Sequence, residues 1–182
     1  ALGLDEGDEL VGVNLCRAGQ HIVLGTKNGM SIRFDESDAR AMGRSAVGVR
    51  GIRLDEGDAV CDMVVTDGTG TLLTVCENGY GKRTEVAEYR EQSGGGKGII
   101  DIRTTERNGK VVNLLSVKDD DEVMMITKDG QIVRTSVGGI SVIGRNTQGV
   151  RCIGLNDGDK LVSVARIPQE EPEAAAGEPG KE

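Results

Sequence analysis

Short apolar runs alternate with glycine-containing turns along most of the chain. Residues 21–24 and 30–34 are apolar runs on either side of Asn28-Gly29. Such a pair is the strongest short signal of a β-hairpin, because a type I′ turn needs positive φ at both central residues. Further strands are expected near residues 59–65, 98–103, 110–117, 149–155 and 160–166. The stretches without alternation are expected to be connecting loops with a helical turn: 35–42, 84–91 and 135–142.

The same pattern recurs three times along the chain. The hairpin pairs stand at spacings of 50 and 51 residues, and an arginine follows each glycine four residues later: Arg33, Arg83 and Arg134. Two further anchors keep this register, a glycine that opens a β-like run (Gly48, Gly98, Gly149) and a polar turn (residues 5–8, 55–58, 108–109, 156–159). Four strands in about 50 residues is the size of a propeller blade.

The expected domain is an all-β array over residues 1–168. Its copies are expected at about 14–64, 65–116 and 117–167, after the end of another copy in residues 1–13. The array is therefore expected to begin upstream of Ala1. Residues 169–182 hold five glutamates and one lysine and are expected to form a disordered acidic tail.

Composition changes this picture in one respect. The 182 residues include 28 glycines, no tryptophan and three aromatic residues, Phe34, Tyr80 and Tyr89. This composition favours many tight turns over a helical bundle. The net charge of −8 argues at first against a nucleic-acid ligand, but half of it comes from the tail. The body is only mildly acidic.

Enzymatic and metal-binding patterns are absent from the sequence. The four cysteines form no C-x-x-C pair, and the single histidine, His21, lies in an expected strand. Residues 93–98 resemble a phosphate loop but lack its first glycine and its Ser or Thr. The acidic turns lack the calcium-loop pattern. We expect no catalytic residue, cofactor or metal in this chain, no membrane span and no signal peptide, and a reducing cytosol as its setting.

Basic residues are the candidate binding groups. A side-chain period of two places Arg33 on the strand face opposite Ile32, and the repeat carries Arg83 and Arg134 to equivalent places. Two interpretations stay open. These residues either form a basic stripe that neutralises phosphates, or each pairs with a neighbouring acid on a solvated face. The candidate phosphate contacts are Arg33, Arg44, Arg50, Lys82, Arg83, Lys97, Arg103, Arg134, Arg145 and Arg151.

Four segments resemble the C-terminal domain of the bacterial DNA gyrase A subunit: ENGYGKRT at 77–84, TERNG at 105–109, GRNTQGVR at 144–151 and RAMGR at 40–44. The resemblance covers essentially all of residues 1–168. It implies a β-pinwheel, a propeller-like disc of four-stranded blades with partly exchanged strands, here about three complete blades and part of another. It also implies that duplex DNA wraps around the basic rim without sequence specificity.

Through the resemblance, the expected partners are duplex DNA, the remainder of gyrase A and the gyrase B subunit in an A2B2 enzyme. The wrap would support ATP-dependent negative supercoiling in the bacterial cytoplasm, at the nucleoid. Two features depart from the family: its Gln-Arg-Arg-Gly-Gly-Lys-Gly box is absent, and only about half of six blades is present. The catalytic tyrosine of the family lies in another domain. The alternatives are the related domain of topoisomerase IV and a propeller-like protein-interaction scaffold.

Overall fold

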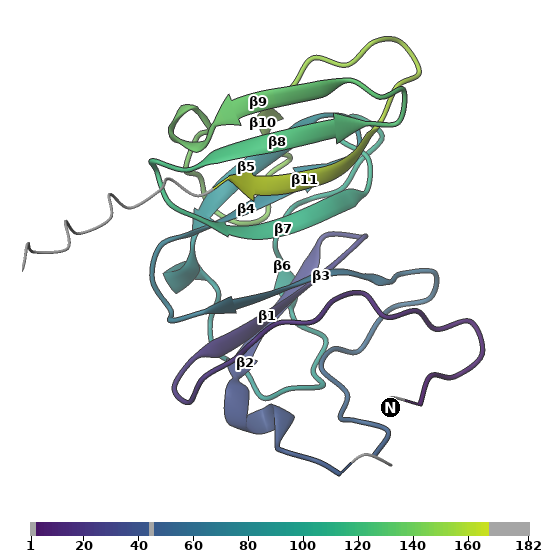
Figure 1. The fold of residues 1–182 in the computed structure, drawn as a ribbon, viewed down its shortest axis with the longest axis vertical. Helices are drawn as coiled ribbons and strands as arrows, with labels where there is room; N and C mark the ends of the chain where they lie inside the picture. The colour runs from purple at the N-terminus through teal and green to yellow at the C-terminus, as the bar shows by residue number, and fades with distance from the viewer. Residues whose placement is uncertain (1–2, 44–45, 168–182) are drawn as a thin grey trace, which may run out of the picture.

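Antiparallel β-strands and three short 3-10 helices make up the regular structure of the described residues (Figure 1). The computed structural model describes residues 3–43 and 46–167. Its strands form two four-stranded sheets and one three-stranded sheet, so the expectation of an all-β, blade-built fold is confirmed. Within the described residues, no helix is long and apolar enough to cross a membrane.

Each sheet is one blade, with its strands in the following spatial order. The first blade is β3 (Val60–Thr66), β1 (His21–Thr26), β2 (Met30–Asp35) and β6 (Ile99–Ile100). The second is β7 (Val111–Val117), β4 (Thr71–Cys76), β5 (Tyr80–Glu85) and β10 (Val150–Arg151). The third is β11 (Leu161–Ile167), β8 (Glu122–Thr127) and β9 (Ile132–Ser136). The 3-10 helices η1 (Glu36–Ala39), η2 (Val86–Glu88) and η3 (Val137–Gly139) follow β2, β5 and β9.

The blades exchange their outermost strands. β6 belongs to the second repeat but pairs with β2 of the first blade, where Ile100 lies opposite Met30. β10 belongs to the third repeat but pairs with β5 of the second blade, where Arg151 lies opposite Tyr80. Among the described residues no strand pairs with the outer edge of β9, and residues 48–52 occupy the repeat position of β6 and β10 without joining a sheet.

The exchange defines an inner and an outer side of the array. The inner strands β3, β7 and β11 pack beside one another. A register shift recurs where each inner strand meets its neighbour, opposite Thr26, Cys76 and Thr127. β6 and β10 lie at the opposite, outer edge of their sheets, and we call this edge with its adjoining loops the rim.

The three hairpins lie where the sequence predicts them, but their turns are not of type I′. Gly29 has a φ of 85° and its amide donates to Thr26 O at 3.0 Å, while Asn28 keeps a negative φ. The equivalent turns at Gly79 and Gly130 have the same bond. Only the glycine adopts the left-handed conformation, which is the geometry of a type I turn followed by a G1 bulge.

The apolar core lies between the blades. Leu73 and Val75 of the second blade pack with Val123 and Met125 of the third. A second apolar cluster lies between the first and second blades, where Val23 of the first blade packs with Leu72 of the second blade. Since each blade has a neighbour on one or both faces, strands in the middle of the stack are buried on both sides.

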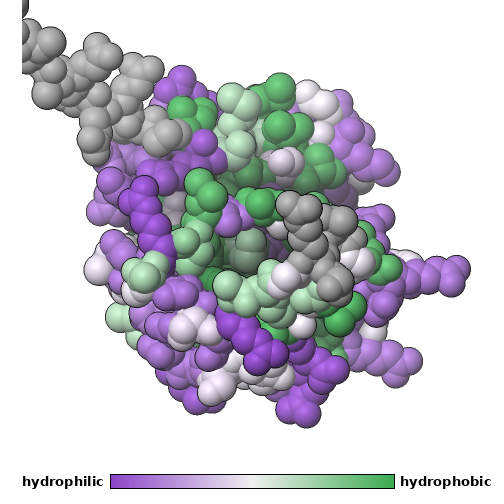
Figure 2. Space-filling model, turned by 60° about the horizontal axis from the view of Figure 1, so that its bottom comes forward, coloured by the Kyte–Doolittle hydropathy of each residue, from purple (hydrophilic) through white to green (hydrophobic). Residues whose placement is uncertain are grey.

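Exposed apolar side chains concentrate in the segments that precede and follow the first hairpin. They include Leu10, Val13, Leu15, Val47 and Val49. Figure 2 shows apolar surface in the middle of the face formed by the lower part of the molecule in Figure 1, framed by hydrophilic side chains. By repeat position, residues 10–15 and 48–52 correspond to the inner and outer strands of a preceding blade.

Candidate nucleic-acid interface

Lys82, one of the expected DNA contacts, lies in the interior. Its side chain is 0 % exposed, and Nζ donates to Asp101 Oδ1 at 2.8 Å and to Thr84 Oγ1 at 2.6 Å. The same carboxylate accepts hydrogen bonds from Tyr89 Oη at 2.5 Å and from Thr74 Oγ1 at 2.7 Å. Burial, and then the charge of Asp101, raise the pKa of Tyr89. A buried charge is tolerated when it is paired and hydrogen-bonded, so Lys82 is a structural residue.

Arg33 and Arg83 connect neighbouring blades. Arg33 donates to the carbonyl oxygens of Val86 and Tyr89, both at 3.3 Å, at the 3-10 turn of the next repeat. Arg83 is 5 % exposed and its Nε donates to Ile140 O at 2.8 Å, at the corresponding turn one repeat further on. These guanidinium groups satisfy carbonyl groups that no strand partner reaches.

The expectation that Arg33 and Arg83 line a solvent-facing stripe is therefore wrong. Alternation separates the two faces of a strand, but it identifies a solvated face only where a single face is covered. Here Ser31 and Ile32, which point to opposite faces, are both 0 % exposed. The stacking of blades covers the face that the alternation assigned to solvent.

Two other expected contacts are exposed but already paired with carboxylates. Arg134 has no further repeat to reach among the described residues, and its guanidinium instead pairs with Glu122 on the adjacent strand. Lys97 Nζ lies 3.1 Å from Asp55 Oδ1. These pairs match the second sequence interpretation, in which a basic residue merely decorates a solvated face. Arg44 lies outside the described residues.

The rim between the first and second blades is built from two loops that are bonded to each other. Residues 101–110 join β6 to β7, and residues 140–149 lead to β10. The amide of Arg103 donates to Thr147 O at 2.7 Å, and the amide of Asn146 donates to Asp101 O at 2.9 Å. Fully buried Asn108 adds a bond from Nδ2 to Gln148 O at 3.1 Å. These cross-links hold the two loops in one relative position.

A positive φ helps to shape this rim. Asn146 has a φ of 57° and is the single non-glycine residue with positive φ among the described residues. It occupies the repeat position of Gly95, whose φ is 82°. The glycine run 94–96 thus provides a left-handed backbone position in the second repeat rather than a phosphate loop.

The rim loops and β10 present four arginines, which we call the rim arginine cluster. Its members are Arg103, Arg107, Arg145 and Arg151. Arg103 donates to Asn146 Oδ1, and Arg145 donates to Ile100 O at 2.9 Å. Within the described residues, none of the four forms an ion pair with a carboxylate. Glu88 Oε2 accepts from the backbone amide of Arg145 at 3.3 Å, so one carboxylate lies beside the cluster, but none of the four guanidinium groups is ion-paired with it.

Arg107 was missing from the sequence-based candidates. Its guanidinium carbon lies 4.8 Å from the centroid of the Tyr80 ring, and that of Arg151 lies 5.6 Å from the same centroid. Arg151 also donates to Tyr80 Oη at 3.2 Å. The signal that could have found it is a departure from the repeat, because Arg107 stands in the turn that is acidic in the first and third copies.

Arg50 occupies the repeat position of Arg151. It is exposed, and among the described residues no carboxylate pairs with it. Thus four of the ten candidates, Arg50, Arg103, Arg145 and Arg151, lie on the outer side and form no ion pair among the described residues. The structure does not bring the nine described candidates together into one stripe.

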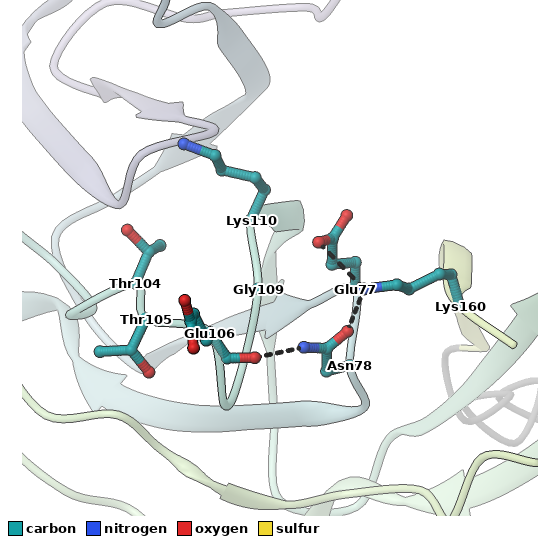
Figure 3. A pocket seen from close by; sticks show the side chains of 8 residues that line it. All are labelled: Glu77, Asn78, Thr104, Thr105, Glu106, Gly109, Lys110 and Lys160. Atoms are coloured by element: carbon teal, nitrogen blue, oxygen red, sulfur yellow. Dashed lines mark hydrogen bonds and ion pairs between the residues drawn. The ribbon is translucent and has the colours of Figure 1, made fainter. Parts of the chain in front are cut away.

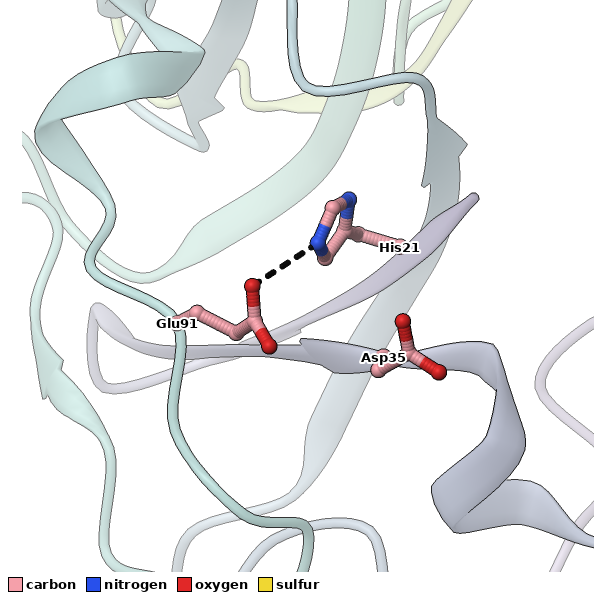
Figure 4. Close-up of side chains that lie close together, drawn as sticks. All are labelled: His21, Asp35 and Glu91. Carbon is pink, nitrogen blue, oxygen red and sulfur yellow. Dashed lines mark hydrogen bonds and ion pairs between the residues drawn. The ribbon is translucent and has the colours of Figure 1, made fainter. Parts of the chain in front are cut away.

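His21, Asp35 and Glu91 form the one cluster of potential metal ligands among the described residues (Figure 4). His21 Nε2 lies 3.0 Å from Glu91 Oε2, and its Nδ1 lies 3.5 Å from an Arg33 guanidinium nitrogen. Hydrogen bonds from the hydroxyl and amide of Ser37 lower the pKa of Asp35. The positive charge of the Arg33 guanidinium beside the ring disfavours the binding of a metal cation, so the group is best explained as a hydrogen-bonded structural histidine.

A pocket of about 470 Å³ lies beside the second hairpin turn (Figure 3). Two lysines line it, but hairpin residues already engage their amines. Lys160 Nζ lies 3.3 Å from Glu77 Oε1 and 2.5 Å from Asn78 Oδ1, and Lys110 Nζ contacts Asn28 Oδ1. These bonds tie the inner strand of one blade to the hairpin of the blade before it.

A family model described as DNA gyrase C-terminal domain, beta-propeller, matches residues 20–67, 71–118 and 121–168. These three segments make up most of the chain. The chain belongs to the DNA gyrase C-terminal domain family. The gyrase family match thus falls on the same three-fold repeat that the sheets display.

Relatives agree with the gyrase family. The chain is 48 % identical over 169 residues to the DNA gyrase A protein of Escherichia coli strain K12, and 47 % identical over 171 residues to that of Haloquadratum walsbyi. Each match covers 93 % of this chain, which spans only about a fifth of these relatives, 19 % and 20 %.

Among solved structures, a DNA gyrase A C-terminal domain matches with a TM-score of 0.76 and 30 % identity, over 82 % of this chain and 51 % of that one. The C-terminal domain of DNA topoisomerase IV matches with a TM-score of 0.80 at 19 % identity, over 91 % of this chain and 52 % of that one. At that identity, the topoisomerase IV match shows a shared fold.

Proposed function

We propose that this chain binds duplex DNA along its rim, through backbone phosphates and without sequence specificity, within a DNA gyrase A protein. The observation that carries the proposal is the rim arginine cluster: four guanidinium groups on cross-linked loops, with no ion-paired carboxylate among the described residues. Duplex DNA carries a dense line of negative charge, and arginine is well suited to bind phosphate oxygens.

The same geometry favours bending over reading of bases. The cluster lies at the outer edge of β10 and its neighbouring loops, and Arg50 occupies the corresponding place one blade earlier. DNA that follows successive blades must curve, and bending a 20–30 bp site by 40–90° costs about 1–6 kcal/mol, which several phosphate contacts together offset. In the parent gyrase, such a wrap would support supercoiling driven by ATP hydrolysis in the B subunit.

The competing assignments have less support. The topoisomerase IV likeness is one of fold, whereas the curated relatives at 42–48 % identity are gyrase A proteins. A protein-interaction scaffold would use the acidic turns. Yet Asp58 Oδ1 accepts from the amide of Asn28 at 2.9 Å, and Asp159 Oδ1 accepts from that of Asp129 at 3.1 Å. These two carboxylates of the acidic turns thus already accept hydrogen bonds from the protein's own hairpin turns.

Salt-dependent binding tests the proposal. The affinity for a 40-bp duplex should fall steeply with salt, and replacing all four cluster arginines by alanine should flatten the slope of log K against log salt by about 3–4. The triple variant Asp5→Asn, Glu6→Gln, Asp8→Asn serves as a charge control, because it alters an exposed turn far along the chain from the rim loops. A wild-type affinity that does not change with salt would refute phosphate binding.

A further inference from the structure

Tyr80 is placed unlike an ordinary core aromatic. It is the first residue of β5, immediately after the hairpin glycine, and its cross-strand partner on the donated strand β10 is Arg151. Its residue exposure is 9 %, because the two guanidinium groups cover it. At the same repeat position the first and third blades carry Met30 and Gln131, so the arrangement is confined to the second blade.

Three separate segments are needed to assemble this arrangement. Tyr80 comes from the hairpin, Arg151 from β10, and Arg107 from the loop between β6 and β7. That loop is fixed by Asn108, which accepts from the amide of Thr105 at 2.7 Å and donates to the loop before β10. The backbone therefore positions both arginines before any ligand arrives.

The electrostatics of this arrangement are incomplete without an anion. Two positive charges approach one aromatic ring, and among the described residues neither has a carboxylate partner. The face of an aromatic ring attracts a guanidinium, but that attraction is modest at exposed sites and leaves most of each charge unneutralised. In agreement, hydrogen bonds and charge from Arg151 and Arg107 lower the pKa of Tyr80, so the surroundings already favour negative charge at its oxygen.

We propose that Arg107 and Arg151 form a preorganised clamp for the phosphodiester backbone, with Tyr80 as its positioning residue. The inference rests on the proposed DNA binding and adds a defined anchor point to it. Flexible surface arginines lose side-chain entropy on binding, whereas arginines already held against a ring lose less. Tyr80 itself supplies no charge, so its contribution is to orient the two groups that do.

The experiment is a double-mutant cycle on the full 182-residue chain with a 40-bp duplex. Tyr80→Leu should weaken binding roughly three- to tenfold, although it removes no charge. In the background Arg107→Ala, Arg151→Ala, the same substitution should have no further effect. Tyr80→Phe keeps the ring and should restore most of the affinity, since only the hydroxyl acceptor for Arg151 is lost.

Structural and functional effects separate in this design. Thermal unfolding of each variant reports damage to the pairing of β5 with β10, and Arg134→Ala provides a matched charge loss at an arginine already paired with Glu122. An equal effect of Tyr80→Leu with and without the two arginines would overturn the clamp. The clamp would also be overturned if replacing Arg103 and Arg145 abolished DNA binding while replacing Arg107 and Arg151 had no effect. That result would leave the proposed function standing.

Inorganic phosphate provides the remaining comparison. If the clamp recognises an extended backbone, millimolar phosphate should not displace the duplex at constant ionic strength. Displacement that depends on Tyr80 would instead identify a site for a free phosphate ion and contradict the DNA-backbone assignment. A wild-type chain that binds no duplex at all would refute the proposed function itself.

Discussion

Basic residues of the β5 strand and those of the rim loops differ in their surroundings although they belong to the same repeat unit. Lys82 and Arg83 are enclosed by the neighbouring blades; Lys82 donates a hydrogen bond to a buried carboxylate, and Arg83 donates one to a main-chain carbonyl oxygen. Arg107 and Arg151 stand on the outer edge against a single tyrosine. The comparison teaches that position in the blade stack, rather than charge, decides whether a basic residue stabilises the fold or remains free to bind a ligand.

The largest predicted effect concerns the interior. Lys82→Met should leave Asp101 buried without its cation, and breaking a buried pair in this way costs about 3–5 kcal/mol of unfolding free energy. The measurement is urea unfolding followed by circular dichroism. Adding Asp101→Asn should recover part of the loss, because it removes the unpaired charge and keeps an acceptor for the Tyr89 and Thr74 hydroxyls. A single variant as stable as the wild-type chain would contradict the interior assignment.

A smaller effect should distinguish two arginines at equivalent repeat positions. Arg83→Met removes a hydrogen bond to Ile140 O and the contact with Asp119, so it should cost about 1.5–3 kcal/mol. Arg134→Met removes an exposed pair and should cost about 0–1 kcal/mol. Denaturant unfolding of both variants measures the difference. Equal costs would mean that the blade stack does not distinguish the two sites.

Sequence periodicity predicted the strands well because each repeat carries its own turn signals. Asn28-Gly29 and its counterparts mark the three hairpins, and Gly98 and Gly149 mark the donated strands β6 and β10. These two strands pair over only two residues each, less than their apolar runs at 98–103 and 149–155 suggested. Beyond the paired residues, each run turns inward to pack Ile102 or Ile153 into the core.

The candidate site was predicted less well, for a physical reason. Alternation along β2 and β5 cannot reveal that both faces are covered, since the covering blade comes from residues about 50 positions away. Arg107 was missed because its role arises from proximity to Tyr80, and the only mark of it in the sequence is its departure from the turn that is acidic in the other two copies. By contrast, Arg145 and Arg151 were found because the segment around them repeats the segment near Arg50.

The smallest predicted effect is a loss of stability in acid at the ion pair between Asp121 and Arg166. Arg166 is neither fully buried nor on the rim. Burial alone would raise the pKa of Asp121, but hydrogen bonds from Arg166 and the amide of Lys118 outweigh it and lower that pKa. A lowered carboxyl pKa stabilises the fold above the ordinary value of about 4 and loses this contribution as the pH falls below it.

Thermal unfolding between pH 6 and pH 3 measures this acid sensitivity. The wild-type chain should lose stability over the lower part of the range, and Asp121→Asn should show a shallower dependence because the titrating carboxyl is gone. If the melting temperatures of the two proteins fall in parallel with pH, titration of Asp121 does not contribute to the acid sensitivity, and the prediction is wrong.

The most direct test of the account is arginine-specific chemical modification, read by mass spectrometry with and without saturating duplex DNA. Arg103, Arg107, Arg145 and Arg151 should react in the free chain and be protected by DNA, while Arg83 should stay unreactive in both states. Rim arginines that remain equally reactive in the complex, or an Arg83 that reacts readily in the free chain, would contradict the division between structural and DNA-binding arginines.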